Sequence, residues 1–90
     1  MVGPESTVAR SNGVVEAQLD EVRVVLNQDL AYLGLDEVGQ RIWDLVESPR
    51  TVASLVETLM GEYEVTEAEC TADVARYVDA LAAHKLVRLS

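Results

Sequence analysis

Cys70 and His84 are the side chains best suited to nucleophilic or metal chemistry, and each residue type occurs only once. A tetrahedral zinc site usually needs four ligands, so these two soft ligands predict no structural metal. No basic side chains stand near Cys70 to stabilise a thiolate, and His84 is typical of a cation at a helix end. The sequence also contains no glycine-rich phosphate loop and no GxSxG or HExxH pattern. We therefore expect no catalytic residue, no metal and no cofactor, and a protein that is not an enzyme.

The charge balance narrows the choice of partner. The 90 residues contain 16 acids and 7 bases, a formal net charge of −9. A protein that neutralises phosphates needs the opposite sign, which argues against nucleic acids and anionic membranes as partners. A single cysteine forms no internal disulfide, and the sequence contains neither a signal peptide nor an apolar run of the ~20 residues needed to span a bilayer. These features predict one cytoplasmic domain that binds a partner.

Three short apolar stretches predict strands over residues 14–19, 22–26 and 30–35, with turns at residues 20–21 and 27–29. Such a small antiparallel meander needs a helical layer to be stable. Residues 1–13 contain Gly, Pro and Ser signals and little periodicity, so they predict a flexible N-terminal tail that touches the fold at Val8. The domain is accordingly expected over residues 14–90.

The rest of the chain predicts three helices. Asp36, Thr51 and Thr66 are the expected N-caps, and Ser48-Pro49 ends the first helix. The order predicts an α+β fold that is winged helix-turn-helix-like, with a three-stranded antiparallel sheet followed by three helices. A winged-helix transcriptional regulator or DNA mimic is one alternative. Its third helix would have four acids against two bases, which disfavours contact with phosphates.

The third predicted strand suggests a different partner. Its residues are apolar and lack the Lys or Pro that usually blunts a sheet edge. A peptide could add there as a further strand, with its side chains held between the sheet and the third helix. Proline at Ala31 or Leu33 should then weaken peptide binding more than folding. The alternative is that residues 2–10 cover this edge.

An ordered set of residues resembles the PqqD-like family. The set comprises Val24-Val25-Leu26-Asn27, Tyr32-Leu33-Gly34-Leu35-Asp36-Glu37-Val38-Gly39, Ile42-Trp43-Asp44-Leu45, Thr51-Val52, Leu55-Val56, Leu59, Tyr63-Glu64-Val65, Asp73-Val74 and Leu81 with Leu86-Val87. The resemblance covers about residues 14–89. It implies a non-catalytic domain that recognises the leader peptide of a ribosomally synthesised, post-translationally modified peptide precursor. The run from Tyr32 to Trp43 is more similar to the free-standing leader-binding proteins of lasso-peptide clusters than to the quinone-cofactor branch.

In that family the leader peptide pairs with the third strand and lies against the third helix. The peptide-binding residues that the resemblance implies are Leu30, Ala31, Tyr32, Leu33, Gly34, Cys70, Asp73, Val74 and Tyr77. The implied partners are the precursor leader peptide, a transglutaminase-like leader protease and a macrocyclase. The alternative within the family is a chaperone of PQQ biosynthesis that delivers a precursor to a radical SAM enzyme. One departure is His84-Lys85, where the family commonly has a glycine, so the end of the third helix is expected to differ.

Overall fold

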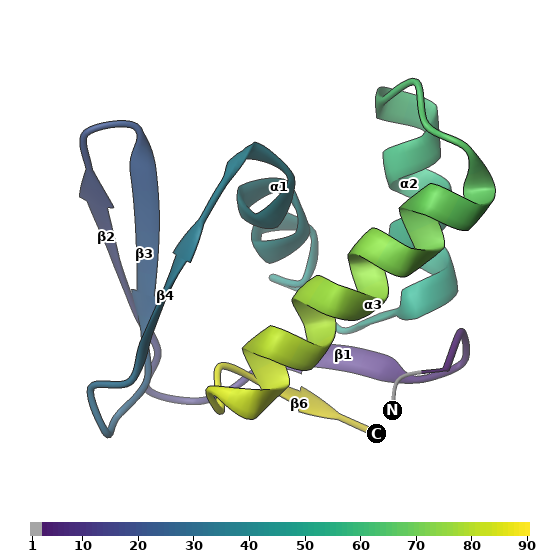
Figure 1. Cartoon of the computed structure of the whole chain (residues 1–90). Coiled ribbons are helices and arrows are strands. Elements are labelled where there is room, and N and C mark those ends of the chain that lie inside the picture. Colours follow the sequence, from purple (N-terminus) through teal and green to yellow (C-terminus); the bar gives the residue numbers. More distant parts are fainter. Residues whose placement is uncertain (1–2) are drawn as a thin grey trace.

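Two small antiparallel sheets and three helices make up the computed structural model, which describes residues 3–90 (Figure 1). The first sheet contains β2 (Val15–Leu19), β3 (Val22–Leu26) and β4 (Tyr32–Leu35), in that order. The second contains β5 (Arg50–Thr51), β1 (Thr7–Arg10) and β6 (Val87–Leu89), with β1 in the centre. The α+β class and the order of a three-stranded meander followed by three helices are confirmed. The winged-helix resemblance stays a prediction.

The helices are α1 (Glu37–Leu45), α2 (Val52–Glu62) and α3 (Glu67–Ala83), and each begins at its predicted cap. The Asp36, Thr51 and Thr66 side chains accept hydrogen bonds from the third main-chain N–H of their helices, at 2.9 to 3.1 Å. These bonds satisfy N–H groups that a helix cannot pair internally. The caps therefore fix where each helix starts relative to the sheets.

The end of α3 uses a residue that seldom occupies this position. Lys85 has a φ of 56°, and its N–H donates to the Ala82 carbonyl at 3.0 Å. The Leu86 N–H reaches back to the Leu81 carbonyl at 2.8 Å. These two bonds form a Schellman motif, in which the left-handed position is usually glycine. A lysine in a strained conformation therefore holds the left-handed position at the end of α3.

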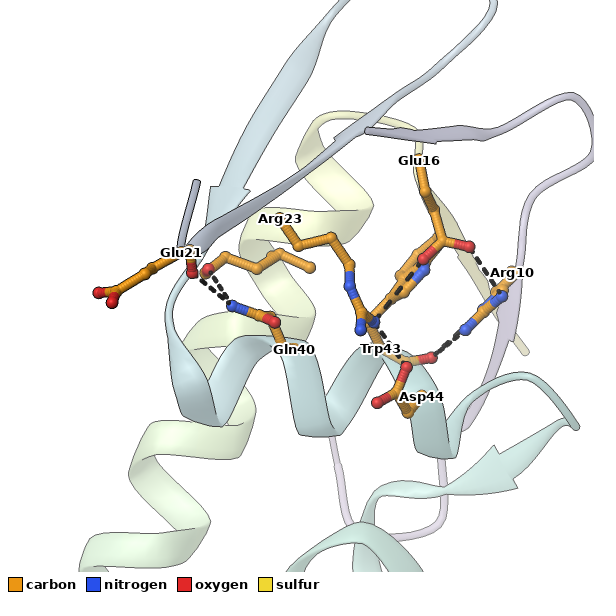
Figure 2. A network of polar contacts seen from close by, with 8 residues as sticks. Arg10, Glu16, Glu21, Arg23, Gln40, Trp43 and Asp44 are labelled. Carbon is orange, nitrogen blue, oxygen red and sulfur yellow. Dashed lines mark hydrogen bonds and ion pairs between the residues drawn. The ribbon is translucent and has the colours of Figure 1, made fainter. Parts of the chain in front are cut away.

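A single core lies between the first sheet, the helices and β1. Its fully buried members include Val25 and Leu35 from the first sheet, and Trp43 from α1. Four charged side chains hold the inward face of the first sheet against α1 and β1, as Figure 2 shows: Arg23 contacts Asp44 at 2.6 Å and Glu16 at 3.7 Å, and Arg10 contacts Glu16 at 3.8 Å. Trp43 is a core residue, as predicted, since only 1% of it is exposed.

The structure differs from the sequence-based prediction at the N-terminus. Val8 is fully buried, which confirms the predicted contact there, but Thr7–Arg10 form a paired strand rather than a flexible tail. Arg10 lies over the Trp43 ring at 4.3 Å and donates to the Trp43 carbonyl. The fold thus begins before residue 14. Residues 1 and 2 of the predicted tail lie outside the described residues.

Candidate functional site

The open edge of β4 is the feature on which a peptide-binding site would depend. Strand β4 pairs with β3 on one side, and none of residues 3–90 pairs with its other side. The Asn27 N–H donates to the Ala31 carbonyl at 2.9 Å, which marks these opposite residues as a bonded pair. Bonded and unbonded pairs alternate along an antiparallel ladder, so Leu33 is bonded to β3. The main-chain N–H and C=O groups of Tyr32 and Gly34 therefore point to the open edge.

This pattern corrects the predicted proline positions. The Ala31 N–H already donates to the Asn27 side chain at 3.0 Å, and the Leu33 N–H belongs to the ladder with β3. Proline at either position would therefore remove a bond that holds the fold. Tyr32 and Gly34 are the positions where proline would remove only an edge donor.

The described part of the N-terminus leaves this edge free. Strand β1 uses both of its sides within the other sheet, where it pairs with β5 and β6. The alternative in which residues 2–10 cover the third strand therefore fails for residues 3–10. Residues 3–10 therefore do not block the addition of a further strand to β4.

Leu30 and Ala31 lie in the turn before β4, so the strand is two residues shorter than predicted. Leu30 has a φ of 65° and is 75% exposed. A loop of this kind usually has a glycine at the left-handed position, because a Cβ there is strained. The turn therefore presents a large apolar side chain at the start of the open edge.

Asn27 is a structural residue that the sequence-based prediction assigned only to a turn. Its side-chain oxygen accepts hydrogen bonds from the Asp29 and Ala31 N–H groups, at 2.8 and 3.0 Å. Its side-chain nitrogen donates to the His84 carbonyl at 2.7 Å. One buried amide thus shapes the turn before β4 and ties it to the end of α3. The only signal in the sequence for this role was an Asn placed directly after an apolar strand and at the start of a turn.

Tyr77 forms a second connection between α3 and the region of β4. Its ring packs so closely on α1 that a Cβ added at Gly39 would lie 2.9 Å from it. Burial, and then a hydrogen bond with Asp36, raises the pKa of the Tyr77 hydroxyl to about 12. Burial alone would raise the pKa of Asp36, but hydrogen bonds from Tyr77 and two main-chain N–H groups lower it overall. Asp36 directly follows β4, so the end of the strand meets the middle of α3.

These two connections fix the orientation of β4 relative to α3. The Asn27 side chain before β4 donates to the His84 carbonyl at the end of α3, and the Tyr77 ring of α3 lies beside Leu35 and Asp36 at the end of β4. The strand therefore runs antiparallel to the second half of the helix. Figure 1 shows β4 as the strand of its sheet nearest to α3. Of the predicted α3 residues, only Tyr77 lies beside the strand.

The other three predicted α3 residues gather at a small apolar hollow beyond the end of β4. Cys70, Asp73 and Val74 line it at the first half of α3, and its volume is about 70 Å³. Val74 is fully buried and forms the floor, while Asp73 is paired with Arg76 at 3.2 Å. The remaining lining residues come from α1, α2 and the segment after α2: Val38, Leu59, Tyr63 and Val65. The hollow has room for a small apolar side chain.

Cys70 has the features of a packing residue. It is 4% exposed, and its thiol lies 3.6 Å from the Val56 carbonyl. Burial, together with the nearby charge of Asp73, raises the pKa of the thiol. A thiolate is therefore disfavoured at neutral pH. Among residues 3–90, no group of three His, Cys, Asp or Glu side chains is placed to hold a metal ion.

The model of the family described as Coenzyme PQQ synthesis protein D (PqqD) matches residues 23–87. The chain belongs to the PqqD family. The match covers most of β3, all of β4 and all three helices, which confirms the resemblance seen in the sequence. No curated protein matches this PqqD-family chain. None of its helices within residues 3–90 is long and apolar enough to cross a membrane.

Two solved structures are similar to this PqqD-family chain. The first is described as TbiB1 in complex with the TbiA(beta) leader peptide; it has a TM-score of 0.77 and 34% sequence identity, and the match covers 89% of this chain and 94% of that one. The second is a lasso peptide synthetase B1 complexed with the leader peptide, with a TM-score of 0.74 and 22% identity over 90% of this chain and 96% of that one. The second likeness shows the fold alone. Both support the architecture of two small sheets and three helices described above.

Proposed function

We propose that this protein is a non-catalytic, cytoplasmic binding protein that recognises the leader peptide of a lasso-peptide precursor. The leader peptide adds to β4 as a further strand, and the protein presents the precursor to a leader protease and then to a macrocyclase. The observation that carries this proposal is the open edge of β4, where the Tyr32 and Gly34 main-chain groups face a gap in pairing beside α3. The resemblance to TbiB1, which is described in complex with a leader peptide, supports it.

The geometry gives each part of the site a distinct task. Main-chain bonds at Tyr32 and Gly34 provide affinity that is independent of sequence, as in other peptides that extend a sheet. The hollow lined by Cys70 and Val74 accepts one small apolar group of the peptide and so contributes selectivity. The 16 acids of the chain favour a leader peptide with basic or neutral flanks.

Gly34→Pro tests strand addition with a labelled leader peptide from the precursor gene that neighbours this one. Proline removes the N–H that faces the open edge and leaves the bonds to β3 in place, so leader affinity should fall about tenfold while the midpoint of urea unfolding changes little. Fluorescence anisotropy measures the affinity. Gly34→Ala is the matched control, because a Cβ at this position meets only Val22 at an ordinary 3.6 Å.

The outcome separates binding from folding. Leu33→Pro should lower both the affinity and the unfolding midpoint, because it breaks a bond within the sheet. Equal affinity for the proline and alanine variants at Gly34 would contradict strand addition at β4. Absence of saturable binding to the unmodified protein at micromolar concentration would contradict leader recognition altogether.

A second candidate function follows from the description of the matching family model. The matching family is described as Coenzyme PQQ synthesis protein D. The sequence resemblance implies that a protein of this type is a chaperone that delivers its precursor peptide to a radical SAM enzyme. The same edge would hold the peptide, so the two functions differ in the precursor and in the enzyme that receives it. Titration with both kinds of precursor distinguishes them, and the resemblance of the run from Tyr32 to Trp43 to leader-binding proteins of lasso-peptide clusters favours the lasso type.

A further inference from the structure

A mostly apolar groove of about 690 Å³ lies between α2 and α3. Figure 1 shows α2 and the first sheet at opposite sides of the molecule, so this groove is separate from the open edge of β4. We call it the α2–α3 groove. The uncharged side chains that define it are Ala53, Val56 and Met60 from α2, and Thr71 and Ala75 from α3.

The shape of the α2–α3 groove suits a helix. Its walls are two helices, whose main-chain groups are already paired, so an extended peptide would find no ladder to join. Ala53, Thr71 and Ala75 are small, which leaves room for the large apolar side chains of a third helix. Met60 is 36% exposed, and its flexible side chain can adapt to such a partner. Pro4 closes one end, where its carbonyl accepts a hydrogen bond from the Ala53 N–H at 3.0 Å.

The charges of the α2–α3 groove indicate the chemistry of that helix. Glu57 and Glu67 line the groove and are exposed, and no Lys or Arg lines it. Within residues 3–90 neither glutamate takes part in an ion pair. A complementary helix is therefore apolar on one face and has basic side chains at its flanks. A second copy of the chain would bring the same glutamates and another net charge of −9, which opposes self-association.

The α2–α3 groove shares α3 with the proposed leader-binding site. Cys70 and Val74 line the apolar hollow, and the residues directly after them, Thr71 and Ala75, line the groove. Successive residues of a helix lie about 100° apart around its axis, so the hollow and the groove use neighbouring faces of the same turns. A protein bound in the groove would therefore lie one helix away from a peptide that reaches the hollow.

We propose that the α2–α3 groove binds an amphipathic helix of the macrocyclase, with apolar side chains in the groove and basic side chains against Glu57 and Glu67. This inference rests on the proposed function. The protease meets a precursor that is still attached to its leader, so the bound leader brings it to this protein. The macrocyclase acts after the leader has been removed, and its substrate no longer ties it here. Docking in the groove keeps the macrocyclase next to the released core peptide and raises its effective concentration.

Glu57→Lys/Met60→Lys tests the groove. Affinity for the purified macrocyclase of the same gene cluster, measured by isothermal titration, should fall about tenfold or more, because two lysines face an apolar and basic helix. Both residues are exposed on α2 and neither lines the hollow, so leader affinity should stay within about twofold and the urea midpoint should change little. Ala72→Lys/Asp79→Lys is the matched control, since it makes the same change in charge at exposed positions of α3 outside the groove.

A salt titration tests the charge complementarity separately. Macrocyclase binding to the unmodified protein should weaken as salt is raised, because exposed ion pairs are screened. Glu57→Gln keeps the size of the side chain and removes its charge, so it should bind more weakly at low salt and depend less on salt. Equal salt dependence of Glu57→Gln and the unmodified protein would contradict a basic partner at Glu57.

The outcomes keep the two proposals apart. Loss of macrocyclase binding in Glu57→Lys/Met60→Lys, with leader binding and the control variant unaffected, supports docking in the groove. Unchanged macrocyclase binding, or equal loss in the control, overturns it while leader recognition stands. A dimer of the unmodified protein in gel filtration that the groove variant abolishes would assign the groove to a second copy and also overturn the proposal. Failure of the unmodified protein to bind the leader peptide would instead remove the proposed function itself.

Discussion

Leu30 holds a left-handed backbone conformation at the start of the open edge, with a φ of 65° and 75% of its surface exposed. Strain of this kind persists at functional sites when the side chain has a use there. Leu30→Gly should therefore raise the free energy of unfolding by about 0.5 to 1 kcal/mol, because glycine relieves the strain but also gains freedom in the unfolded chain. The same change should weaken leader binding about fivefold through loss of apolar contact.

Lys85→Gly is the matched comparison for Leu30→Gly, because Lys85 has a φ of 56° at the end of α3. It should stabilise the protein by a similar amount and leave leader affinity unchanged. Urea unfolding and anisotropy measure the two effects. If Leu30→Gly and Lys85→Gly have the same effect on affinity, Leu30 makes no contact with the peptide.

The Tyr77 hydroxyl predicts a loss of stability at alkaline pH. Its pKa is raised to about 12 by burial and by hydrogen bonding with Asp36, against 10.0 in an unperturbed tyrosine. The unfolded chain therefore releases this proton first as pH rises, so the contribution of Tyr77 is complete below about pH 10 and is lost as pH approaches 12. Tyr77→Phe should be less stable at neutral pH, and the difference should shrink across this interval. Urea midpoints at several pH values measure it, and a constant difference would contradict the raised pKa of Tyr77.

The elements that the sequence predicted correctly are those with strong local signals. The caps at Asp36, Thr51 and Thr66 and the turn at residues 20–21 have side chains with well-known preferences, and all appear as predicted. The start of β4 was wrong by two residues, because Leu30 adopts a conformation that its type disfavours. The hydrogen-bonding direction of β4 could not be predicted either, since it depends on the pairing of Asn27 with Ala31 across the turn.

The Asn27 amide should control how β4 lies against α3. Asn27→Asp keeps an oxygen for the turn but replaces the donor to the His84 carbonyl with a negative oxygen at a helix C-terminus. The free energy of unfolding should fall by about 1 to 3 kcal/mol, and leader affinity should fall with it as the strand and helix separate. Protonation of the new carboxyl restores a donor, so the stability gap to the unmodified protein should narrow at acidic pH. A gap that does not change with pH would show that the donor to His84 is unimportant.

At the scale of the whole molecule, the sequence pattern did not predict the second sheet, which contains β5, β1 and β6. Thr7–Arg10, Arg50–Thr51 and Val87–Leu89 come from the start, middle and end of the chain, and each segment is too short to show a strand period. Their pairing is tertiary, and Val8 becomes fully buried only when all three segments meet. The two sheets therefore have different roles. The sheet around β1 closes the core, and the meander presents the open edge.

Removal of residues 1–10 tests whether the two sheets have separate roles. The deletion exposes the core that Val8 covers and removes the Arg10 contacts with Trp43, so thermal unfolding should occur at a lower temperature and with lower cooperativity.

Val8→Ala should reproduce part of the loss, about 2 kcal/mol, by leaving a cavity. The open edge of β4 lies in the other sheet, so the Val8→Ala protein should bind leader peptide with unchanged affinity at a temperature where it is folded. An unchanged melting temperature after the deletion would mean that β1 adds nothing to the fold. A loss of leader affinity in folded Val8→Ala would mean that the two sheets do not act separately.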